Sequence, residues 1–255
     1  MKQLALHADS LSKSYSNKKI LEHISLQVEA GEFISLIGPS GCGKSTLLRL
    51  LLGEEPSDSG SLHVFGKEVS DIPKDVGIVY QKYSLFPHLS IRKNIQLGMS
   101  KHKDLDLQDS FEEMIKLFGL TGVLDKYPHQ LSGGQQQRAS IVQSLIVKPK
   151  ILFMDEAFGA LDPFTKTELK KFMDEYWKKH STTIIFITHD LNDAVSMGSR
   201  VILLSQYYKK EIGQGSKIVL DIPTKLDMTP QEESDLILRI KEEGFDPEFL
   251  QELTA

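Results

Sequence analysis

The sequence FISLIGPSGCGKSTLLRL occupies residues 33–50 and decides how the rest of the chain can fold. Its first five residues predict a short buried strand, and Leu47 to Leu50 begin a helical pattern. Between them, residues 38–46 form a glycine-rich loop of the type G-x-x-x-x-G-K-[ST]. Glycines let the backbone curl so that several N–H groups point at one phosphate, and the following helix directs its positive end there. The segment therefore predicts a phosphate-binding loop in an α/β fold.

Two side chains of this loop carry the expected chemistry. Lys44 can reach the β- and γ-phosphates of a nucleotide, and the Ser45 hydroxyl can ligate Mg²⁺. The alternative is a glycine turn that precedes a helix by chance, which would need strand, loop, Lys and Ser to coincide. The residues expected to contact the nucleotide are Gly38, Pro39, Ser40, Gly41, Cys42, Gly43, Lys44, Ser45 and Thr46.

Composition narrows the class of protein. The chain has 255 residues, of which 40% are hydrophobic and 25% charged, as in an ordinary globular protein. Its net charge of -5 gives no support to a nucleic-acid surface. Cys42 is the only cysteine, so no internal disulfide can form, and a reducing compartment is the simple interpretation. No run approaches the roughly 18 to 20 apolar residues of a membrane span, so at a membrane a partner must supply the spans.

Short β-branched runs predict the buried strands of a largely parallel sheet. They lie at residues 33–37, 77–80, 151–154 and 183–187. The middle of the chain differs, because residues 90–148 contain no convincing strand. Residues 110–120 and 132–147 instead carry apolar side chains at helical spacing. We therefore expect a helical subdomain, at about residues 86–148, inserted into an α/β core.

One predicted strand, residues 151–154, ends in two acids, Asp155 and Glu156. Open parallel sheets bind ligands at the carboxyl ends of their strands. Asp155 suits the Mg²⁺ shell. Glu156 should point elsewhere, because side chains alternate along a strand, and could accept a proton from an attacking water. The alternative is an acid pair that caps the next helix.

The stretch LSGGQQQR, at residues 131–138, is the most specific in the chain. Ser132 can cap a helix, while Gly133 and Gly134 expose backbone N–H groups. The result is a second anion-binding helix start. One chain does not need two such starts for one γ-phosphate. A head-to-tail dimer does, because each nucleotide is then held by one loop and one opposing helix.

From about residue 4 to residue 212, the chain resembles the ATPase subunits of ABC transporters, since these motifs follow the family's order. The resemblance implies a P-loop NTPase core of the RecA type with an inserted helical subdomain. Tyr15 would stack on adenine. Gln81 would join core and subdomain, sense the γ-phosphate and help to hold Mg²⁺. His189 would contact the γ-phosphate.

The resemblance also assigns the remaining motifs. Residues 132–135 match the signature, residues 155 and 156 the Walker B pair, and residues 160–162 the D-loop. The catalytic set would be Glu156, His189, Gln81 and Lys44, and the metal ligands Ser45, Gln81 and Asp155. Nucleotide contacts outside the phosphate-binding loop would come from Tyr15, Ser132, Gly133, Gly134, Gln135 and Asp162.

Two local matches suggest a subfamily. Residues 158–163 and 200–205 look like importer ATPases of the nitrate/sulfonate/taurine group, whereas residues 85–88 and 155–158 look more like the osmoprotectant group. The chain also departs from the family pattern. Ala157 replaces a common Pro, and the sequence VQSL at residues 142–145 replaces Ala-Arg-Ala-Leu. Neither position is expected to touch ATP.

The tail differs in charge from the rest of the chain. Residues 221–255 hold ten Asp and Glu against three Lys and Arg. Thr229 to Glu232 resemble a capping box with Pro at the first helical position, Gly244 would end that helix, and Asp246-Pro247 could start another. We expect residues 1–220 to form the ATPase domain and residues 221–255 an acidic helical extension. The extension is either a solvated hairpin docked on the ATPase domain or a regulatory element.

Together with these features, the resemblance implies an Mg²⁺-dependent ATPase that drives a bacterial importer for a small polar solute of the nitrate/sulfonate/taurine type. Its partners would be transmembrane permease subunits, a second ATPase subunit and, indirectly, a solute-binding protein, at the cytoplasmic face of the membrane. Alternatives are the ATPase of an osmoprotectant importer, or of an exporter or lipid transporter. A chromosome or repair ATPase would need a long coiled coil between loop and signature, which the sequence lacks.

The apolar residues just after Gln81 give a further expectation. Residues 83–95 present Tyr83, Leu85, Phe86, Leu89 and Ile91 at the entry to the helical subdomain. A partner's helix is one natural cover for them, and packing inside the subdomain is the other.

Overall fold

A computed structural model describes residues 3–69, 71, 73, 75–81, 84–100, 107–159, 161–205, 215–224 and 228–244. Contacts divide the chain into two units. The first unit comprises Met1–Lys74 and Thr183–Ala255, and the second comprises Asp75–Thr182. Among the described residues, no helix combines the length and the apolar character that a membrane crossing requires.

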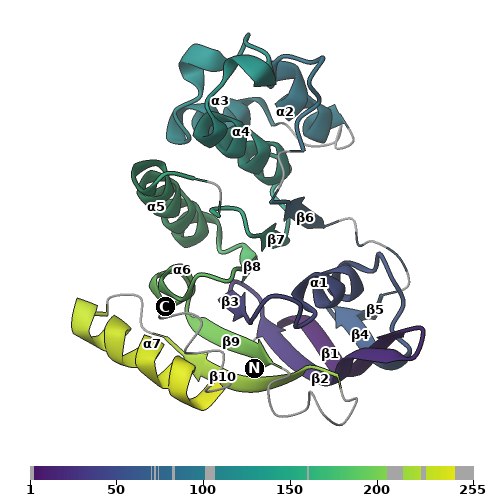
Figure 1. Cartoon of the computed structure of the whole chain (residues 1–255). Helices are drawn as coiled ribbons and strands as arrows, with labels where there is room; N and C mark the ends of the chain where they lie inside the picture. The colour runs from purple at the N-terminus through teal and green to yellow at the C-terminus, as the bar shows by residue number, and fades with distance from the viewer. Residues whose placement is uncertain are drawn as a thin grey trace. The chain divides into compact units, whose positions relative to one another are not determined.

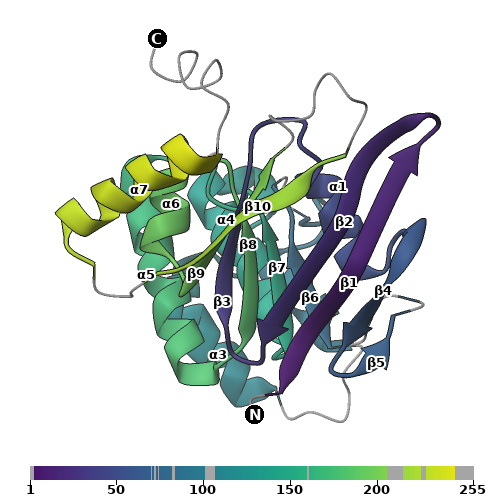
Figure 2. The same ribbon diagram turned by 90° about the horizontal axis from the view of Figure 1, so that it is seen from below.

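The first unit contains an antiparallel sheet that the sequence analysis did not predict. It consists of β1 (Leu4–Tyr15), β2 (Lys18–Glu29), β4 (Ser59–Val64) and β5 (Lys67–Glu68), in the order β2-β1-β4-β5. Figure 2 shows the long hairpin of β1 and β2 with β4 beside it. Its register shifts between Ala8 and Leu11, and Ser10 and His23 have positive φ values of 51°. Such bulges interrupt the alternation of apolar and polar residues, so the two strands of this hairpin show no clear period of two in the sequence.

The predicted strands at residues 33–37 and 183–187 are confirmed in this unit. β3 (Phe33–Ile37) lies between β8 (Thr183–Ile187) and β9 (Arg200–Ser205), and both neighbours are parallel to it. Every residue of β3 and β8 is buried, which explains their continuous apolar sequence. β10 (Lys217–Pro223) then adds an antiparallel edge to β9. The division into an ATPase domain and an acidic extension at residue 220 stays a prediction. β10 runs across that residue.

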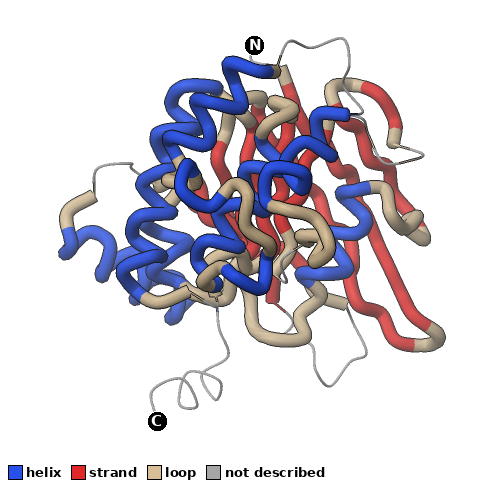
Figure 3. Tube along the Cα trace, turned by 90° about the horizontal axis from the view of Figure 1, so that it is seen from above, coloured by secondary structure: helices blue, strands red, loops and turns tan. Residues whose placement is uncertain are grey.

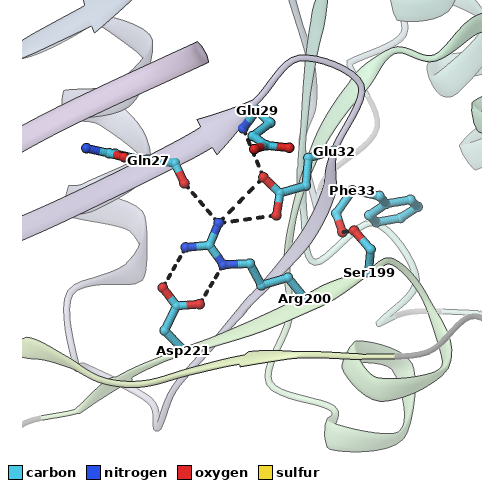
Figure 4. A network of polar contacts seen from close by, with 7 residues as sticks. All are labelled: Gln27, Glu29, Glu32, Phe33, Ser199, Arg200 and Asp221. Atoms are coloured by element: carbon cyan, nitrogen blue, oxygen red, sulfur yellow. Dashed lines mark hydrogen bonds and ion pairs between the residues drawn. The ribbon is translucent and has the colours of Figure 1, made fainter. Parts of the chain in front are cut away.

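Arg200 fastens this edge of the sheet (Figure 4). Its Nε and Nη2 donate to the two carboxylate oxygens of Asp221 at 2.5 and 2.6 Å. Its Nη1 donates to the Gln27 carbonyl at 2.9 Å and to Glu32 at 3.2 Å. This planar, two-point pairing is the strongest arrangement that a guanidinium makes with a carboxylate. It joins β9 to β10 and to the end of β2.

The described part of the first unit also contains the helices α1 (Lys44–Leu52), α6 (Leu191–Ser196) and α7 (Pro230–Gly244). In Figure 1, α7 lies along α6, β9 and β10. The shared core of this region consists of Ile37, Ala194, Val195, Val201, Leu203, Ile222 and Ile240. The predicted capping box is confirmed, since Glu232 accepts from Thr229 N at 2.8 Å and Thr229 Oγ1 accepts from Glu232 N at 3.3 Å. The helix start expected at Asp246-Pro247 lies outside the described residues.

The second unit carries the other two predicted strands. β6 (Val76–Val79) and β7 (Ile151–Asp155) form a parallel pair in which Val79 is level with Met154. The unit also contains α2 (Ile91–Ser100), α3 (Gln108–Leu117), α4 (Gly133–Leu145) and α5 (Pro163–His180). Two short 3-10 turns, Thr121–Val123 and Pro128–Gln130, lie between α3 and α4.

The prediction that the middle of the chain is helical is confirmed. The described part of residues 90–148 contains helices and loops and no strand, as the blue and tan segments of Figure 3 show. Of the two covers expected for the apolar residues after Gln81, packing inside the subdomain holds for Leu85 and Ile91. Leu85 is only 9% exposed and Ile91 is fully buried, so both pack inside the unit. Phe86 is 48% exposed and remains available to a partner, whereas Tyr83 lies outside the described residues.

Candidate functional site

The phosphate-binding loop leaves β3 at Gly38 and enters α1 at Lys44. A Cβ at Gly38 would lie 2.3 Å from the carbonyl oxygen of Leu204, so only glycine fits there. Gly41 and Gly43 have φ values of 78° and 99°, which side chains with a Cβ rarely adopt. Gly43 is the N-cap of α1 and has no side chain to cap it. The first N–H groups of α1 are therefore left for an anion.

Lys44 and Cys42 occupy the inside of this loop. The Lys44 ammonium donates to the carbonyl oxygens of Gly38, at 2.6 Å, and of Pro39, at 3.1 Å. The lysine is thereby held within the curl of the backbone, where a phosphate would be met. Cys42 is 2% exposed, and burial raises the pKa of its thiol. This supports a filler role for Cys42, because a nucleophile would need a lowered pKa.

The remaining residues of the loop are arranged as the motif requires. Ser45 is exposed in the first turn of α1, while Thr46 is buried with 8% exposure. The loop also contacts the hairpin of the antiparallel sheet, because Ile20 and Leu21 lie 3.0 Å from where a Cβ at Gly43 would stand. β2 is thus packed against the start of α1.

His189 lies at the same edge of the sheet as the phosphate-binding loop. It follows β8, which runs parallel to β3, and Thr188 N donates to the Leu36 carbonyl at 3.1 Å. The chain around it is fixed by Asp190, whose carboxylate caps α6 and whose N–H donates to Thr188 Oγ1 at 3.0 Å. His189 itself is exposed. Because the carboxyl ends of parallel strands meet at one edge, the first unit brings Lys44, Ser45 and His189 to the same side.

Tyr15 ends β1 and keeps 40% of its surface exposed. Its hydroxyl donates to the carboxylate of Glu55, which Arg49 also contacts at 3.0 Å. The hydrogen bond from Tyr15, together with Arg49, lowers the pKa of Glu55. Lys13 Nζ lies 5.6 Å from the centre of the Tyr15 ring. The ring is therefore oriented by its hydroxyl while much of its surface stays open to a flat ligand.

In the second unit, the structure brings Gln81 and Glu156 together. Gln81 follows β6 and the acid pair follows β7, and Gln81 Nε2 donates to Glu156 Oε2 at 2.8 Å. Because the amide nitrogen of Gln81 donates to Glu156, the amide oxygen of Gln81 is the atom that could bind a cation. Asp155 is the last residue of β7 and is half-buried.

The direction of Glu156 has a different cause from the one expected. β7 ends at Asp155, and Glu156 has a φ of 47°, in the left-handed region. Strand alternation therefore does not apply to it. Such a conformation costs about 1 to 2 kcal/mol for a residue other than glycine, and strained backbone of this kind concentrates at functional sites. The alternative role, a helix cap, is excluded, because α5 begins at Pro163 and is capped by Asp162.

Asp162 is expected from the sequence to contact nucleotide, and in the structure it is the N-cap of α5. Its carboxylate accepts from Thr165 N at 3.0 Å, and hydrogen bonds from Thr165 lower its pKa. Leu161 is described beside it, whereas Ala160 lies outside the described residues. A contact between Asp162 and nucleotide stays a prediction.

The signature residues begin α4 as expected. Ser132 Oγ accepts from Gln135 N at 3.3 Å, and Gln135 Oε1 accepts from Ser132 N at 3.2 Å, which forms a complete capping box. Ser132 and Gly133 are exposed. Gly134 is buried against α5, and a Cβ there would lie 2.4 Å from Thr165 Cγ2. The two glycines therefore have different roles. Gly134 permits close packing of α4 against α5, whereas Gly133 leaves the first turn of α4 exposed.

The expected metal ligands are oxygen donors: the Ser45 hydroxyl, the Gln81 amide and the Asp155 carboxylate. Oxygen donors of this kind suit Mg²⁺. Within the described ranges, no group of three or more His, Cys, Asp and Glu side chains gathers as a metal site of its own. The donor set would therefore be completed by water and phosphate oxygens, as Mg²⁺ usually is.

Sequence reasoning missed the side chains that hold the expected residues in place. Glu55 and Lys13 flank Tyr15, and Ser144 on α4 donates to the Ile78 carbonyl of β6 at 2.6 Å. Only Ser144 gave a signal, because it departs from the family pattern. The partners of Tyr15 could not be read from the sequence, since Glu55 is 40 residues away.

Comparisons with known proteins show which family the chain is similar to. The family described as ABC transporter matches residues 21–159. The sulfate/thiosulfate import ATP-binding protein of Synechococcus elongatus is 36% identical over 222 residues, which cover 85% of this chain and 64% of that protein. The chain thus spans about two thirds of the length of that relative. The aliphatic sulfonates import ATP-binding protein of Bacillus cereus is 36% identical over 206 residues, which cover 79% of this chain and 82% of that protein.

Two solved structures share the fold. One is an ATP-binding cassette in a dimeric, post-hydrolysis state bound to ADP and Pi, with 27% identity, a TM-score of 0.71 and coverage of 88% of this chain and 100% of that one. The other is a protein of Clostridium perfringens that is part of an ABC transporter complex, with 25% identity, a TM-score of 0.74 and coverage of 94% and 96%.

Proposed function

The chain belongs to the ABC transporter ATP-binding family, and on that premise we propose that it hydrolyses ATP to drive the import of a small polar solute. The observation that carries the hydrolysis is the pairing of Gln81 with Glu156 directly after Asp155, at the carboxyl ends of β6 and β7. In this pairing Glu156 supplies an oriented carboxylate. The Gln81 amide and the Asp155 carboxylate supply two oxygen ligands for a cation at the same edge of the two strands. The open start of α1 supplies the complementary site for phosphate.

In this proposal, each residue has a separable task. Backbone N–H groups of residues 38–46 and the Lys44 ammonium bind the phosphates of ATP. Ser45, Asp155 and Gln81 would hold Mg²⁺, which neutralises phosphate charge when it is bound. Glu156 accepts the proton of the attacking water, and His189 contacts the γ-phosphate. Tyr15 holds adenine.

A second copy of the chain completes each site. The start of α1 already offers one anion-binding helix start in each chain, so the start of α4 is not needed for the same γ-phosphate. Facing the nucleotide of a second subunit, it would supply N–H groups and a positive helix end. A related cassette has been solved as a dimer with ADP and Pi. Two nucleotides would then hold the dimer closed, and hydrolysis would release it.

The remaining partners are proposed from the family. Transmembrane permease subunits would bind the dimer at the cytoplasmic face of the membrane, and a solute-binding protein would deliver the solute to them. The exposed Phe86 offers the permease an apolar contact. No nucleic-acid partner is proposed, in keeping with the net charge of -5.

The solute is expected to be a small oxyanion such as a sulfonate. Relatives at 36% identity are named as importers of sulfate/thiosulfate and of aliphatic sulfonates. The test is to reconstitute the chain with its cognate permease and solute-binding protein in vesicles and to measure ATP turnover with single solutes. Sulfonates, sulfate or nitrate should raise turnover several-fold. Stimulation by betaine alone would favour an osmoprotectant importer, and stimulation by a lipid alone would overturn the importer.

Tyr15 provides a test of nucleotide binding. Base–aromatic stacking is worth about 1 to 3 kcal/mol in nucleic-acid complexes, so Tyr15→Ala should weaken ATP binding roughly 5- to 150-fold. Tyr15→Trp should be mild. Tyr15→Phe keeps the ring but loses the hydrogen bond to Glu55, so it should fall between the two. Titration with a fluorescent ATP analogue measures all three, and equal losses for Ala and Phe would show that the hydroxyl matters and the ring does not.

A further inference from the structure

Two serines one turn apart on α4 bind the chain on either side of Gln81. Ser144 Oγ donates to the Ile78 carbonyl at 2.6 Å, three residues before Gln81. The hydroxyl groups of Ser140 and Ser84 are hydrogen-bonded at 3.1 Å, three residues after it. Gln81 is therefore the midpoint of a short segment whose two ends are attached to the same helix.

The backbone of α4 also lies unusually close to β6. A Cβ at Gly77 would stand 3.2 Å from the Ser144 carbonyl oxygen and 3.1 Å from Pro149. Glycine at residue 77 thus lets the helix approach the strand closely enough for the Ser144 hydroxyl to reach Ile78. Ser144 has a second acceptor, the Ser140 carbonyl in its own helix, but at 3.3 Å this bond is much longer. The Ile78 carbonyl is the main acceptor of the Ser144 hydroxyl.

On its other side, α4 is fixed against α2. Gln143 Nε2 donates to the Asn94 carbonyl at 3.0 Å, and a Cβ at Gly98 would stand 2.8 Å from the Gln143 carbonyl oxygen. The helix is thus held between α2 and β6 by adjacent residues. A displacement of α4 must move Ile78 and Ser84 with it or break the hydrogen bonds that they make to the helix.

Val142, Gln143 and Ser144 are the residues at which the chain departs from the common Ala-Arg-Ala-Leu pattern of its family. An alanine at residue 144 could not bind the Ile78 carbonyl. The attachment of α4 to the Gln81 segment is therefore a property of this chain that the family resemblance does not supply.

We propose that Ser144 is a positioning residue for Gln81, and that through it the signature helix sets the place of the Gln81–Glu156 pair. The inference rests on the proposed ATPase function. The signature residue Ser132 is the N-cap of α4, and Ser144 lies near the end of the helix. The position of the helix start, where a second subunit's nucleotide would bind, is thereby linked to the position of the amide that contacts Glu156.

Two nearly isosteric variants, Ser144→Thr and Ser144→Val, isolate the hydroxyl. Both are β-branched, so they change helix propensity alike, and only Thr keeps the donor. Ser144→Thr should retain kcat for ATP within twofold. Ser144→Val should lower kcat about fivefold, the factor that one ordinary hydrogen bond is worth, with KM for ATP changed less than twofold. Equal kcat values for Thr and Val would overturn the proposal.

The pathway through Gln81 is tested in a second background. With Gln81→Ala, the amide that Ser144 positions is gone, so Ser144→Thr and Ser144→Val should give the same residual kcat. A fivefold difference that persists there would show that Ser144 acts in another way. Ser234 on α7 is the matched control, because its hydroxyl likewise donates within a helix, to the Pro230 carbonyl at 2.9 Å. Ser234→Val and Ser234→Thr should not differ.

A readout that does not need hydrolysis separates this inference from the proposed function. In protein labelled with ¹⁵N-glutamine, the side-chain amide resonances of Gln81, assigned through Gln81→Ala, should match wild type in Ser144→Thr and shift in Ser144→Val. Unshifted resonances in both variants would refute the positioning role even if the chain hydrolysed no ATP. If Ser144→Val does not fold, Ser144→Ala replaces it in both experiments with the same expected outcomes.

Discussion

Glu156→Gln is expected to lower ATP turnover at least a hundredfold, because general-base catalysis contributes about 10²- to 10⁴-fold. An amide has the shape of the carboxylate and can still accept a hydrogen bond from Gln81 through its oxygen, as Glu156 does at 2.8 Å. It cannot take up a proton from water. ATP affinity should therefore change less than about twofold, since the residue acts on the attacking water and not on the phosphates.

Three measurements define this outcome. Phosphate release gives turnover, titration with an ATP analogue gives affinity, and size-exclusion in the presence of MgATP should show the variant accumulating as a dimer that wild type does not retain. Glu175→Gln, at an exposed position of α5, is the matched control and should behave as wild type. Hydrolysis by Glu156→Gln at a rate near wild type would remove Glu156 from the role of base.

The phosphate-binding loop could be predicted because all of its determinants are contiguous. Gly38, Gly41 and Gly43 have the conformations and close contacts that the motif implies, and β3 ends directly before them. The long apolar strands were predictable for a related reason, since burial on both faces leaves an uninterrupted apolar run. The hairpin of β1 and β2 was not, because bulges at Ser10 and His23 shift its alternation.

The sequence predicts a set of candidate functional residues but not the causes of their geometry. Alternation along β7 was expected to turn Glu156 away from Asp155, yet Glu156 lies beyond the strand with a left-handed φ of 47°. Its contact with Gln81 joins residues 75 positions apart, and no local pattern encodes such a distance. Motifs therefore select the candidate residues, and tertiary contacts decide how their side chains are oriented.

Leu85 and Phe86 show where composition fails. Both are large and apolar, but Leu85 is 9% exposed and Phe86 is 48% exposed. The difference is made by Asn94, which is fully buried and whose side chain accepts from Phe86 N at 2.7 Å and donates to the Phe86 carbonyl at 3.1 Å. These bonds fix the backbone of the turn and so decide which of two adjacent side chains faces inward.

In a head-to-tail dimer each nucleotide would depend on two subunits. We therefore expect defects in the loop and in the signature to complement each other between subunits. Lys44→Ala should abolish ATP binding to its own loop but leave its signature intact. Gly133→Asp should do the reverse. Gly133 is exposed in the first turn of α4, where a carboxylate favours the helix but repels a γ-phosphate. Each variant alone should hydrolyse ATP at least a hundredfold more slowly than wild type.

Mixing the two variants should restore hydrolysis. When equal amounts of the two variants exchange subunits at random, about half of the two-fold dimers contain one subunit of each variant. Each such dimer has one intact pair of loop and signature among its two sites. About a quarter of all sites should therefore be active. The intact pair joins the loop of the Gly133→Asp subunit to the signature of the Lys44→Ala subunit. Gly122→Asp, at an exposed glycine outside the signature, is the control and should be active alone. A mixture that hydrolyses no faster than the mean of its two parents would mean that no site is shared between subunits, because a site completed within one chain cannot be repaired by another.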